Sequence, residues 1–303
     1  MIDITNKAST LRQATAQATV LVSKQETIDA LVNNKVPKGN VFEMAKTAGL
    51  FAVKKTADLI PDCHPMPVEY TGVDYEIKGL HIIINIQVKT IYRTGVEVEA
   101  MHGASIIALT IYDMLKPIDK KIEIQNIRLL EKQGGKSDFN DQFKNNIKAA
   151  IVVCSDSISA GKKEDKAGKS IIEKLQEYHV DIIEYTIIPD HVERIQEITN
   201  KHAELNTDLL VFTGGTGLSP KDLTPEAILP LLDREIPGIA EASRNYGQDR
   251  TPYAMLSRSL AGVKCNTLIL ALPGSTKGAA ESMDALFPSL LHIFRIMKGA
   301  GHN

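Results

Sequence analysis

Two oppositely charged side chains near the end of a predicted helix could transfer protons. Asp113 and Lys116 lie at the end of an apolar segment, residues 96–115, that we predict to be helical. Residues three apart share one helix face, so the carboxylate and the ammonium can pair. An exposed ion pair worth under about 1 kcal/mol is one interpretation. Because Ala104 and Leu109 share this face, we expect burial, which favours a catalytic pair instead.

A histidine and several lysines could bind an anionic substrate and move protons on it. His64 lies between Pro61 and Pro65, and the prolines exclude it from a helix interior or a central strand. A positioned imidazole is a common proton-transfer group. Lys38 lies at a turn that leads into a predicted helix, and Lys54 lies near the end of that helix.

Two acidic residues open the same predicted helix. Glu97 and Glu99 suit the positive end of the helix dipole, so a purely structural role is one interpretation. A role in substrate binding is the alternative. Glu99 and Asp113 are fourteen residues apart, which is about 21 Å along a helix. If both are catalytic, two subunits must meet with these helices antiparallel, so we expect a site at a subunit interface.

The second half of the chain contains a glycine-rich loop that could bind phosphate. The loop consists of Thr213, Gly214, Gly215, Thr216 and Gly217. Glycines let a backbone approach a ligand closely, and consecutive free N–H groups can surround an anion. For such a loop alone, a tight turn between a strand and a helix is an equally good interpretation.

Polar residues follow three other predicted strands in this half. They are Ser155 and Asp156, then Asp190, and then Pro273, Gly274 and Ser275. Because parallel strands end at one edge of a sheet, these residues and Asp222 should gather beside the glycine loop. Carboxylates beside a phosphate-binding loop indicate Mg²⁺ held between protein and nucleotide. Taken singly, each aspartate could instead cap a helix or lie in a solvated turn.

The elements that position these residues have different patterns in the two halves. In the first half we predict an α+β domain with an antiparallel, ferredoxin-like sheet, from helices 45–56 and 96–115 and strands 68–77, 80–91 and 122–130. In the second half, apolar strands alternate with helices, which is typical of a doubly wound α/β domain with a mostly parallel sheet. The strands are 149–154, 182–188, 208–213 and 267–272, and the helices are 168–178, 192–204 and 279–297.

A polar stretch between residues 136 and 148 separates the halves, so we predict domains 1–140 and 147–303. With 43% hydrophobic and 24% charged residues, the composition is that of a globular protein. The net charge of -2 predicts no general attraction to nucleic acid or membranes. Three distant cysteines argue against a disulfide framework, a structural zinc site or an iron–sulfur cluster. We expect a cytoplasmic protein without a signal peptide or a membrane span.

From about residue 149 to 299 the chain resembles the molybdopterin adenylyltransferases. The shared motifs are S-D-x-x-S-x-G (155–161), I-P-D (188–190), T-G-G-T-G (213–217), D-x-T-P-E-A (222–227), L-S-R-S (256–259) and L-P-G (272–274). The resemblance implies adenylation of the molybdopterin terminal phosphate by Mg-ATP, with release of pyrophosphate. It implies catalytic and Mg²⁺-binding roles for Asp190 and Asp222. The implied substrate-binding residues are Ser155, Asp156, the glycine loop, Ser257, Pro273, Gly274 and Ser275.

From residue 2 to about residue 138 the chain resembles the MoaC-type cyclic pyranopterin monophosphate synthases. The shared motifs are K-G-N-V-F (38–42), D-L-I-P-x-C-H-P (58–65), T-G-V-E-x-E-A (94–100), A-L-T-I-Y-D-M-x-K (108–116) and G-G-K-S (134–137). The resemblance implies conversion of 3′,8-cyclo-7,8-dihydro-GTP to cyclic pyranopterin monophosphate and pyrophosphate, with no cofactor. Asp113 and Lys116 match the catalytic pair. The implied substrate contacts are Lys38, Lys54, Cys63, His64, Glu97, Val98, Glu99 and Lys136.

Together the two resemblances predict a bifunctional enzyme of molybdenum cofactor biosynthesis with pterin and nucleotide substrates. An alternative is that the second domain only binds pterin and serves as an oligomerisation module. A different nucleotidyl transfer on the same fold is a third possibility. The resemblances imply a hexameric first domain and a trimeric second one, which are compatible in one assembly with threefold symmetry.

Overall fold

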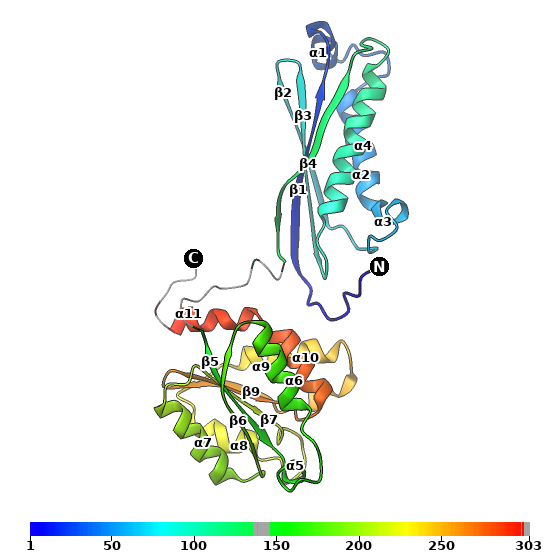
Figure 1. Cartoon of the computed structure of the whole chain (residues 1–303). Coiled ribbons are helices and arrows are strands. Elements are labelled where there is room, and N and C mark those ends of the chain that lie inside the picture. Colours follow the sequence, from blue (N-terminus) through cyan, green and yellow to red (C-terminus); the bar gives the residue numbers. More distant parts are fainter. Residues whose placement is uncertain (136–137, 139–145, 298, 300–303) are drawn as a thin grey trace. The chain divides into compact units, whose positions relative to one another are not determined.

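The computed structural model describes residues 1–135, 138, 146–297 and 299 (Figure 1). The chain divides into two compact units, Met1–Asp138 and Phe139–Asn303. No helix among the described residues combines the length and the apolar character that crossing a lipid bilayer requires.

The first unit is an antiparallel sheet with helices on one face (Figure 1). Its strand order is β2-β3-β1-β4. The strands are β1 (Thr10–Leu21), β2 (Tyr70–Lys78), β3 (His81–Tyr92) and β4 (Glu123–Gln133). The helices are α1 (Gln25–Val32), α2 (Val41–Lys54), α3 (Thr56–Leu59) and α4 (Glu97–Leu115).

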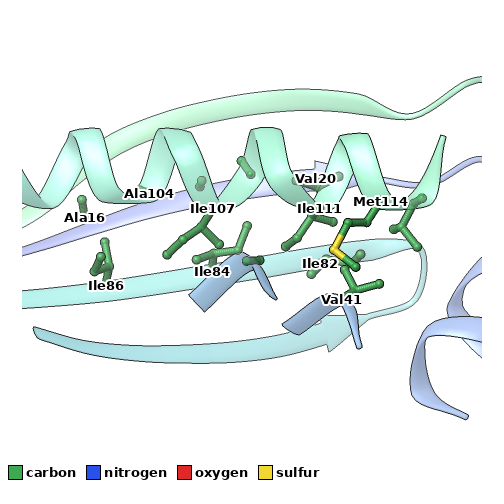
Figure 2. Close-up of a cluster of buried hydrophobic side chains, with 14 of the residues drawn as sticks. Ala16, Val20, Val41, Ile82, Ile84, Ile86, Ala104, Ile107, Ile111 and Met114 are labelled. Carbon is green, nitrogen blue, oxygen red and sulfur yellow. The ribbon is translucent and has the colours of Figure 1, made fainter. Parts of the chain in front are cut away.

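Alternating side chains attach α4 to the sheet. Ile82, Ile84 and Ile86 are buried at every second position of β3, because successive residues of a strand point to opposite faces. Figure 2 shows them opposite Ile107 and Ile111 of α4. Each such side chain contributes roughly 1.5–3 kcal/mol on burial. This packing fixes the helix whose two ends carry the candidate site residues.

Glycines let α2 and α4 pack closely. A Cβ atom at Gly49 of α2 would lie 2.4 Å from Ile107 Cγ1, and one at Gly103 of α4 would lie 2.7 Å from Val53 Cγ2. Neither position can therefore accept a side chain unless the facing side chains move. The close packing holds the end of α2 beside the start of α4.

The second unit is a six-stranded sheet in the order β6-β5-β7-β10-β9-β8. Strands β5 (Lys148–Cys154), β6 (Asp181–Ile188), β7 (Leu209–Thr213) and β10 (Thr267–Leu272) run parallel. The antiparallel strand β9 (Leu260–Lys264) and the short β8 (Arg234–Glu235) complete one edge. The mostly parallel sheet predicted from the alternating pattern is confirmed.

Helices cover both faces of this sheet (Figure 1). One core cluster includes α6 (Ala167–Glu177), α10 (Thr276–Leu286) and α11 (Ile293–Met297), with α9 (Pro237–Gln248) on the same side. The other includes α7 (Val192–Glu204) and α8 (Thr224–Ile228). Ala149 and Ile151 of β5 belong to the first cluster and Ala150 and Val152 to the second, so this strand is apolar throughout. The shorter elements are α5 (Asp156–Ser159), η2 (Leu229–Leu231), η3 (Pro252–Leu256) and η4 (Ser289–His292).

Several predicted elements were wrong or missing. Strand β1 was not predicted, because its inward positions include Ala14, Ala16 and Ala18, and alanine is a weak strand former. The first predicted helix begins at residue 41 instead of 45. The continuous helix predicted for residues 279–297 ends at Leu286, since Pro288 cannot continue it. Strands β8 and β9 and helix α9 were also missed.

Candidate active sites

A lysine–aspartate–lysine cluster lies at the end of α4. Asp113 accepts hydrogen bonds from Lys116 Nζ at 2.8 Å and from Lys38 Nζ at 2.6 Å. These bonds, first from Lys116 and then from Lys38, lower the pKa of Asp113 to about 2. The same contact raises the pKa of Lys116. The cluster therefore carries two ammonium groups around one carboxylate at neutral pH, which suits a phosphate-bearing substrate.

The predicted burial of this pair was wrong for a single chain. The side chains of Asp113 and Lys116 are half exposed, and Leu109 on the same face is 54% exposed. Leu109 is therefore not covered by the chain itself, whereas Ala104, which we predicted to share its face, is fully buried.

A second group of candidates lies at the start of α4. Glu99 is only 3% exposed. Its pKa is raised mainly by burial and further by the negative charge of the nearby Glu97. Burial and the charge of Glu99 also raise the pKa of the Cys63 thiol. His64 Nε2 lies 2.8 Å from the carbonyl oxygen of Ile2. The structure thus brings Cys63, Glu97 and Glu99 close together, with His64 next in the chain.

Lys54 and Val98 also lie at this end of the helix pair formed by α2 and α4. Lys54 is the last residue of α2. Two residues later, the Thr56 hydroxyl lies 3.1 Å from His102 Nδ1, which places this end of α2 beside the first half of α4. Val98 is exposed in the first turn of α4. Lys136 lies outside the described residues. Within one chain, the candidates therefore form two groups at opposite ends of a 19-residue helix.

A cavity of about 280 Å³ beside Glu97 contains charged residues that the sequence analysis missed. Arg12 on β1 is 7% exposed and donates to the Tyr92 carbonyl at 3.2 Å, and burial lowers its pKa. Lys132 of β4 pairs with Glu97 at 3.2 Å. Lys7 also lines this cavity. The inward-facing Arg12 could have been found from the alternation of β1, had that strand been predicted.

The predicted carboxylate edge is present in the second unit. The Asp156 backbone N–H donates to Asp190 Oδ2 at 3.3 Å, and the Asp190 N–H donates to Asp156 Oδ1 at 3.2 Å. Burial raises the pKa of Asp190, and the charges of Asp156 and Asp222 raise it further. Asp190 Oδ1 is buried and has no hydrogen-bond partner among the described residues. A buried, unpaired carboxylate oxygen is costly, which suits a site completed by a cation.

The glycine loop brings its backbone against these aspartates. Gly214 has φ +103°, and a Cβ there would lie 2.1 Å from the Cys154 carbonyl oxygen. A Cβ at Gly215 would lie 3.0 Å from Asp190 Oδ1, and one at Gly217 would lie 2.8 Å from Asp222 Oδ2. Only glycine therefore permits this approach.

Threonines of the loop region hold it in place. Thr213 Oγ1 donates to the Pro273 carbonyl at 2.8 Å, and Thr224 Oγ1 donates to the Gly214 carbonyl at 2.9 Å. The Thr216 carbonyl accepts the backbone N–H of Arg258 at 3.0 Å. The loop is therefore fixed from β10, from α8 and from the segment before β9.

The described residues contain no cluster of three or more His, Cys, Asp and Glu side chains that could hold a metal ion. Asp190 and Asp222 nevertheless fit Mg²⁺, which binds few protein carboxylates and takes its other ligands from water and phosphate. The unpaired Asp190 Oδ1 is the observation that supports this fit.

Arg258 is a further residue that the sequence analysis did not single out. Its Nε donates to the Gly217 carbonyl at 2.7 Å and its Nη2 to the Asp222 carbonyl at 2.5 Å. Its Nη1 contacts the carboxylate of Glu226. The L-S-R-S motif contained this arginine, but only the fold shows that it joins the glycine loop to Asp222.

Two cavities flank the carboxyl end of β10. One, of about 320 Å³, is lined mainly by apolar atoms and includes the candidates Ser257, Pro273 and Ser275, together with Arg244 and Tyr253. The other, of about 670 Å³, includes the candidates Ser155, Gly274 and Ser275. The second-domain candidates therefore lie around one continuous edge of the sheet.

Two family models match the chain in succession. The MoaC family model matches residues 1–135, and a model described as a probable molybdopterin binding domain matches residues 150–292. Together with the two sites, these matches define a two-domain enzyme of molybdenum cofactor biosynthesis.

The chain is 40% identical over 302 residues to the molybdenum cofactor biosynthesis bifunctional protein of Chlorobaculum tepidum, covering 100% of this chain and 96% of that protein. It is 45% identical over 143 residues to a cyclic pyranopterin monophosphate synthase of Clostridium perfringens, covering 46% of this chain and 90% of that protein. The crystal structure of the molybdopterin biosynthesis enzyme MoaB from Thermus thermophilus matches with 40% identity and a TM-score of 0.49, covering 52% of this chain and 99% of that one. The chain belongs to the family of bifunctional molybdenum cofactor biosynthesis proteins.

Proposed function

We propose that this chain catalyses two separate reactions on precursors of the molybdenum cofactor. The first domain converts 3′,8-cyclo-7,8-dihydro-GTP to cyclic pyranopterin monophosphate and pyrophosphate. The second domain transfers AMP from Mg-ATP to the terminal phosphate of molybdopterin. The observation that carries the proposal is that each matched half presents its own charged site, one around Asp113 and one around Asp190 and Asp222.

In the first domain, the charge states of the cluster support specific roles. Lys116 stays protonated because its pKa is raised, so it can stabilise negative charge on the substrate and can protonate only a strongly basic atom formed as rings open and close. Asp113 stays ionised and positions both Lys116 and Lys38. A cyclic phosphate forms from a triphosphate when a sugar hydroxyl attacks the α-phosphorus, and Lys38 can stabilise the departing pyrophosphate.

The first-domain site requires a second subunit under this proposal. Glu99 and Asp113 are about 21 Å apart along α4, too far for one small substrate. The surface of α2 and α4 supports an interface, because it exposes large apolar side chains. These are Met44, Phe51, Val98, Leu109 and Tyr112. We propose that antiparallel α4 helices of two subunits complete each site in a hexamer.

In the second domain, Asp190 and Asp222 would hold Mg²⁺ bound to ATP. When bound, the cation would neutralise charge on the phosphates. The glycine loop offers backbone N–H groups to phosphate oxygens, and Arg258 holds the loop against Asp222. An oxygen of the molybdopterin phosphate then attacks the α-phosphorus, and pyrophosphate departs. The apolar cavity beside Ser257 suits a flat ring.

We extend the proposal to the finer description of the domains, with limits at 1–140 and 147–303. The strand–helix–strand–strand–helix–strand succession and the order β4-β1-β3-β2 support a ferredoxin-like first domain. Helices on both faces of the second sheet support a doubly wound fold. Because both substrates derive from nucleotides, we propose that the enzyme acts in the cytoplasm.

An adenylation assay tests the second activity directly. Full-length protein is incubated with molybdopterin, ATP and Mg²⁺, and the adenylated product and pyrophosphate are quantified. We expect equimolar formation of both. If the protein binds molybdopterin but releases no pyrophosphate, the second domain is a binding and oligomerisation module instead.

A further inference from the structure

The larger cavity at the sheet edge is lined by cations that have no role in the adenylation described above. The cavity measures about 670 Å³ and lies between the segments that follow β5 and β10. Lys162, Lys163 and Lys166 line this cavity. Gly274, Ser275 and Thr276, at the start of the 11-residue helix α10, also line it.

Two carboxylates, Glu164 and Asp165, line the same cavity, and each also has other hydrogen-bond partners. Glu164 pairs with Lys169 at 2.6 Å. Asp165 is 3% exposed and accepts the N–H groups of Gly168 and Lys169 and, at 2.8 Å, the hydroxyl of Tyr185.

The three lysines form no ion pair within 4.0 Å among those found in the described part of the chain. Lys166 does lie near enough to Glu164 for its charge to help lower the pKa of that carboxyl group. The cavity lining therefore carries three ammonium groups against two carboxylates, and this excess of positive charge favours a bound anion.

Backbone hydrogen bonds hold the lysine loop in place. The Gly161 N–H donates to the Ile158 carbonyl at 2.9 Å, and the Lys162 N–H donates to the Ser157 carbonyl at 2.9 Å. The buried Asp165 attaches the other end of the loop to α6 and β6. Little backbone ordering is therefore required when an anion binds.

The cavity adjoins the glycine loop. A Cβ at Gly274 would lie 2.8 Å from the Cα of Gly214, so the lysine cavity and the phosphate-binding loop share a wall. Ser155, on the cavity side, directly precedes Asp156, which contacts Asp190. A nucleotide whose α-phosphate lies at the glycine loop could extend its remaining phosphates into this cavity.

We propose that Lys162, Lys163 and Lys166 bind the β- and γ-phosphates of ATP and retain them as pyrophosphate. This inference rests on the proposed adenylation. In that reaction a new P–O bond forms at the α-phosphorus and the bond from the α-phosphorus to the bridging oxygen breaks. The electron pair remains on pyrophosphate, and the lysines stabilise the charge that develops there.

Calorimetric titration with inorganic pyrophosphate tests the site. The full-length wild type is compared with a Lys162→Ala, Lys163→Ala variant and with a Lys148→Ala, Lys264→Ala control. The control removes the same charge at the opposite end of the sheet. We expect about tenfold weaker binding at the second-domain site in the first variant only, for two lost charge contacts. Any pyrophosphate binding by the first domain is the same in all three proteins, so a difference between them reports the second domain.

The kinetic readout separates this site from the adenylation activity itself. In the first variant, the KM for ATP should rise about tenfold, while the affinity for AMP stays unchanged. Unchanged pyrophosphate affinity, or an equal loss in the control, would overturn the lysine site. If the wild type shows lysine-dependent pyrophosphate binding but no adenylation, the polyphosphate site stands and the proposed reaction fails.

Discussion

Two inactive variants of the first domain should restore activity to each other when they share an oligomer. The variants are Glu99→Gln and Asp113→Asn, which alter opposite ends of α4. Both changes keep the shape of the side chain. Each variant alone should lose about 10²-fold or more of its synthase activity, as is common when a proton-transferring or substrate-positioning group is removed.

The size of the recovery follows from the geometry. If each site combines Glu99 of one subunit with Asp113 of its partner, a mixed dimer contains one site with both residues intact and one with neither. Equal amounts of the two variants give about half mixed dimers, so about a quarter of the wild-type sites are functional. If both residues served one site within the same chain, no site would be intact in any mixture.

The assay is coexpression of two differently tagged variants, tandem purification, and measurement of cyclic pyranopterin monophosphate formation. Proteins mixed after folding, without subunit exchange, serve as the control and should stay inactive. Recovery near 25% of wild-type activity in the coexpressed sample supports the shared site. Activity no higher than that of the single variants would refute the antiparallel arrangement.

Three further predictions concern other parts of the chain. Arg258→Lys should slow adenylation about tenfold or more and leave the synthase unchanged, because lysine lacks the forked donors that hold the glycine loop; equal loss of both activities would point to a folding defect. Asp119→Asn should lower the free energy of unfolding, measured in urea, by about 2 kcal/mol. The Ser23 N–H and hydroxyl both donate to the Asp119 carboxylate, and the NH₂ group of asparagine cannot accept either hydrogen bond. Burial alone would raise the pKa of Asp119, but hydrogen bonds beginning with that from Ser23 lower it to about 2, so its stabilisation is complete above pH 3.8 and is lost as the pH falls through about 2. Burial and the charge of Asp156 raise the pKa of Asp190 in the free enzyme. The kcat/KM for adenylation, which reports the free enzyme, should therefore fall in acid with a midpoint above pH 3.8, and a midpoint at or below that value would contradict a role for the ionised carboxylate.

The periodic elements of both domains could be predicted because their side chains report local burial. The strands β5, β7 and β10 are apolar runs between polar turns, and β6 alternates between exposed and partly buried residues. The ends of β5 and β6 fixed the edge where Asp156 and Asp190 meet. Strand β1 escaped prediction although it is central in its sheet. Its alternating alanines are buried by α4, and that contact is not encoded in the strand's own propensity.

The contents of the sites were only partly predictable. Asp113 and Lys116 are neighbours on one helix, so their pairing followed from spacing alone. The pairing of Asp113 with Lys38 joins residues 75 positions apart, and no local pattern indicates it. Arg258 likewise reaches Gly217 across 41 positions.

The predicted burial of Asp113, Lys116 and Leu109 on α4 was wrong for a related reason. The apolar composition around Leu109 shows that a face should be covered. It does not show whether the same chain or another subunit covers it.

Pyrophosphate release by single variants tests the central claim that two independent active sites share this chain. Wild type, Asp113→Asn and Asp222→Asn are each given 3′,8-cyclo-7,8-dihydro-GTP, or molybdopterin with Mg-ATP. We predict that Asp113→Asn abolishes only the first reaction and Asp222→Asn only the second. Loss of both reactions in either variant, or a wild type that performs only one of them, would contradict the account.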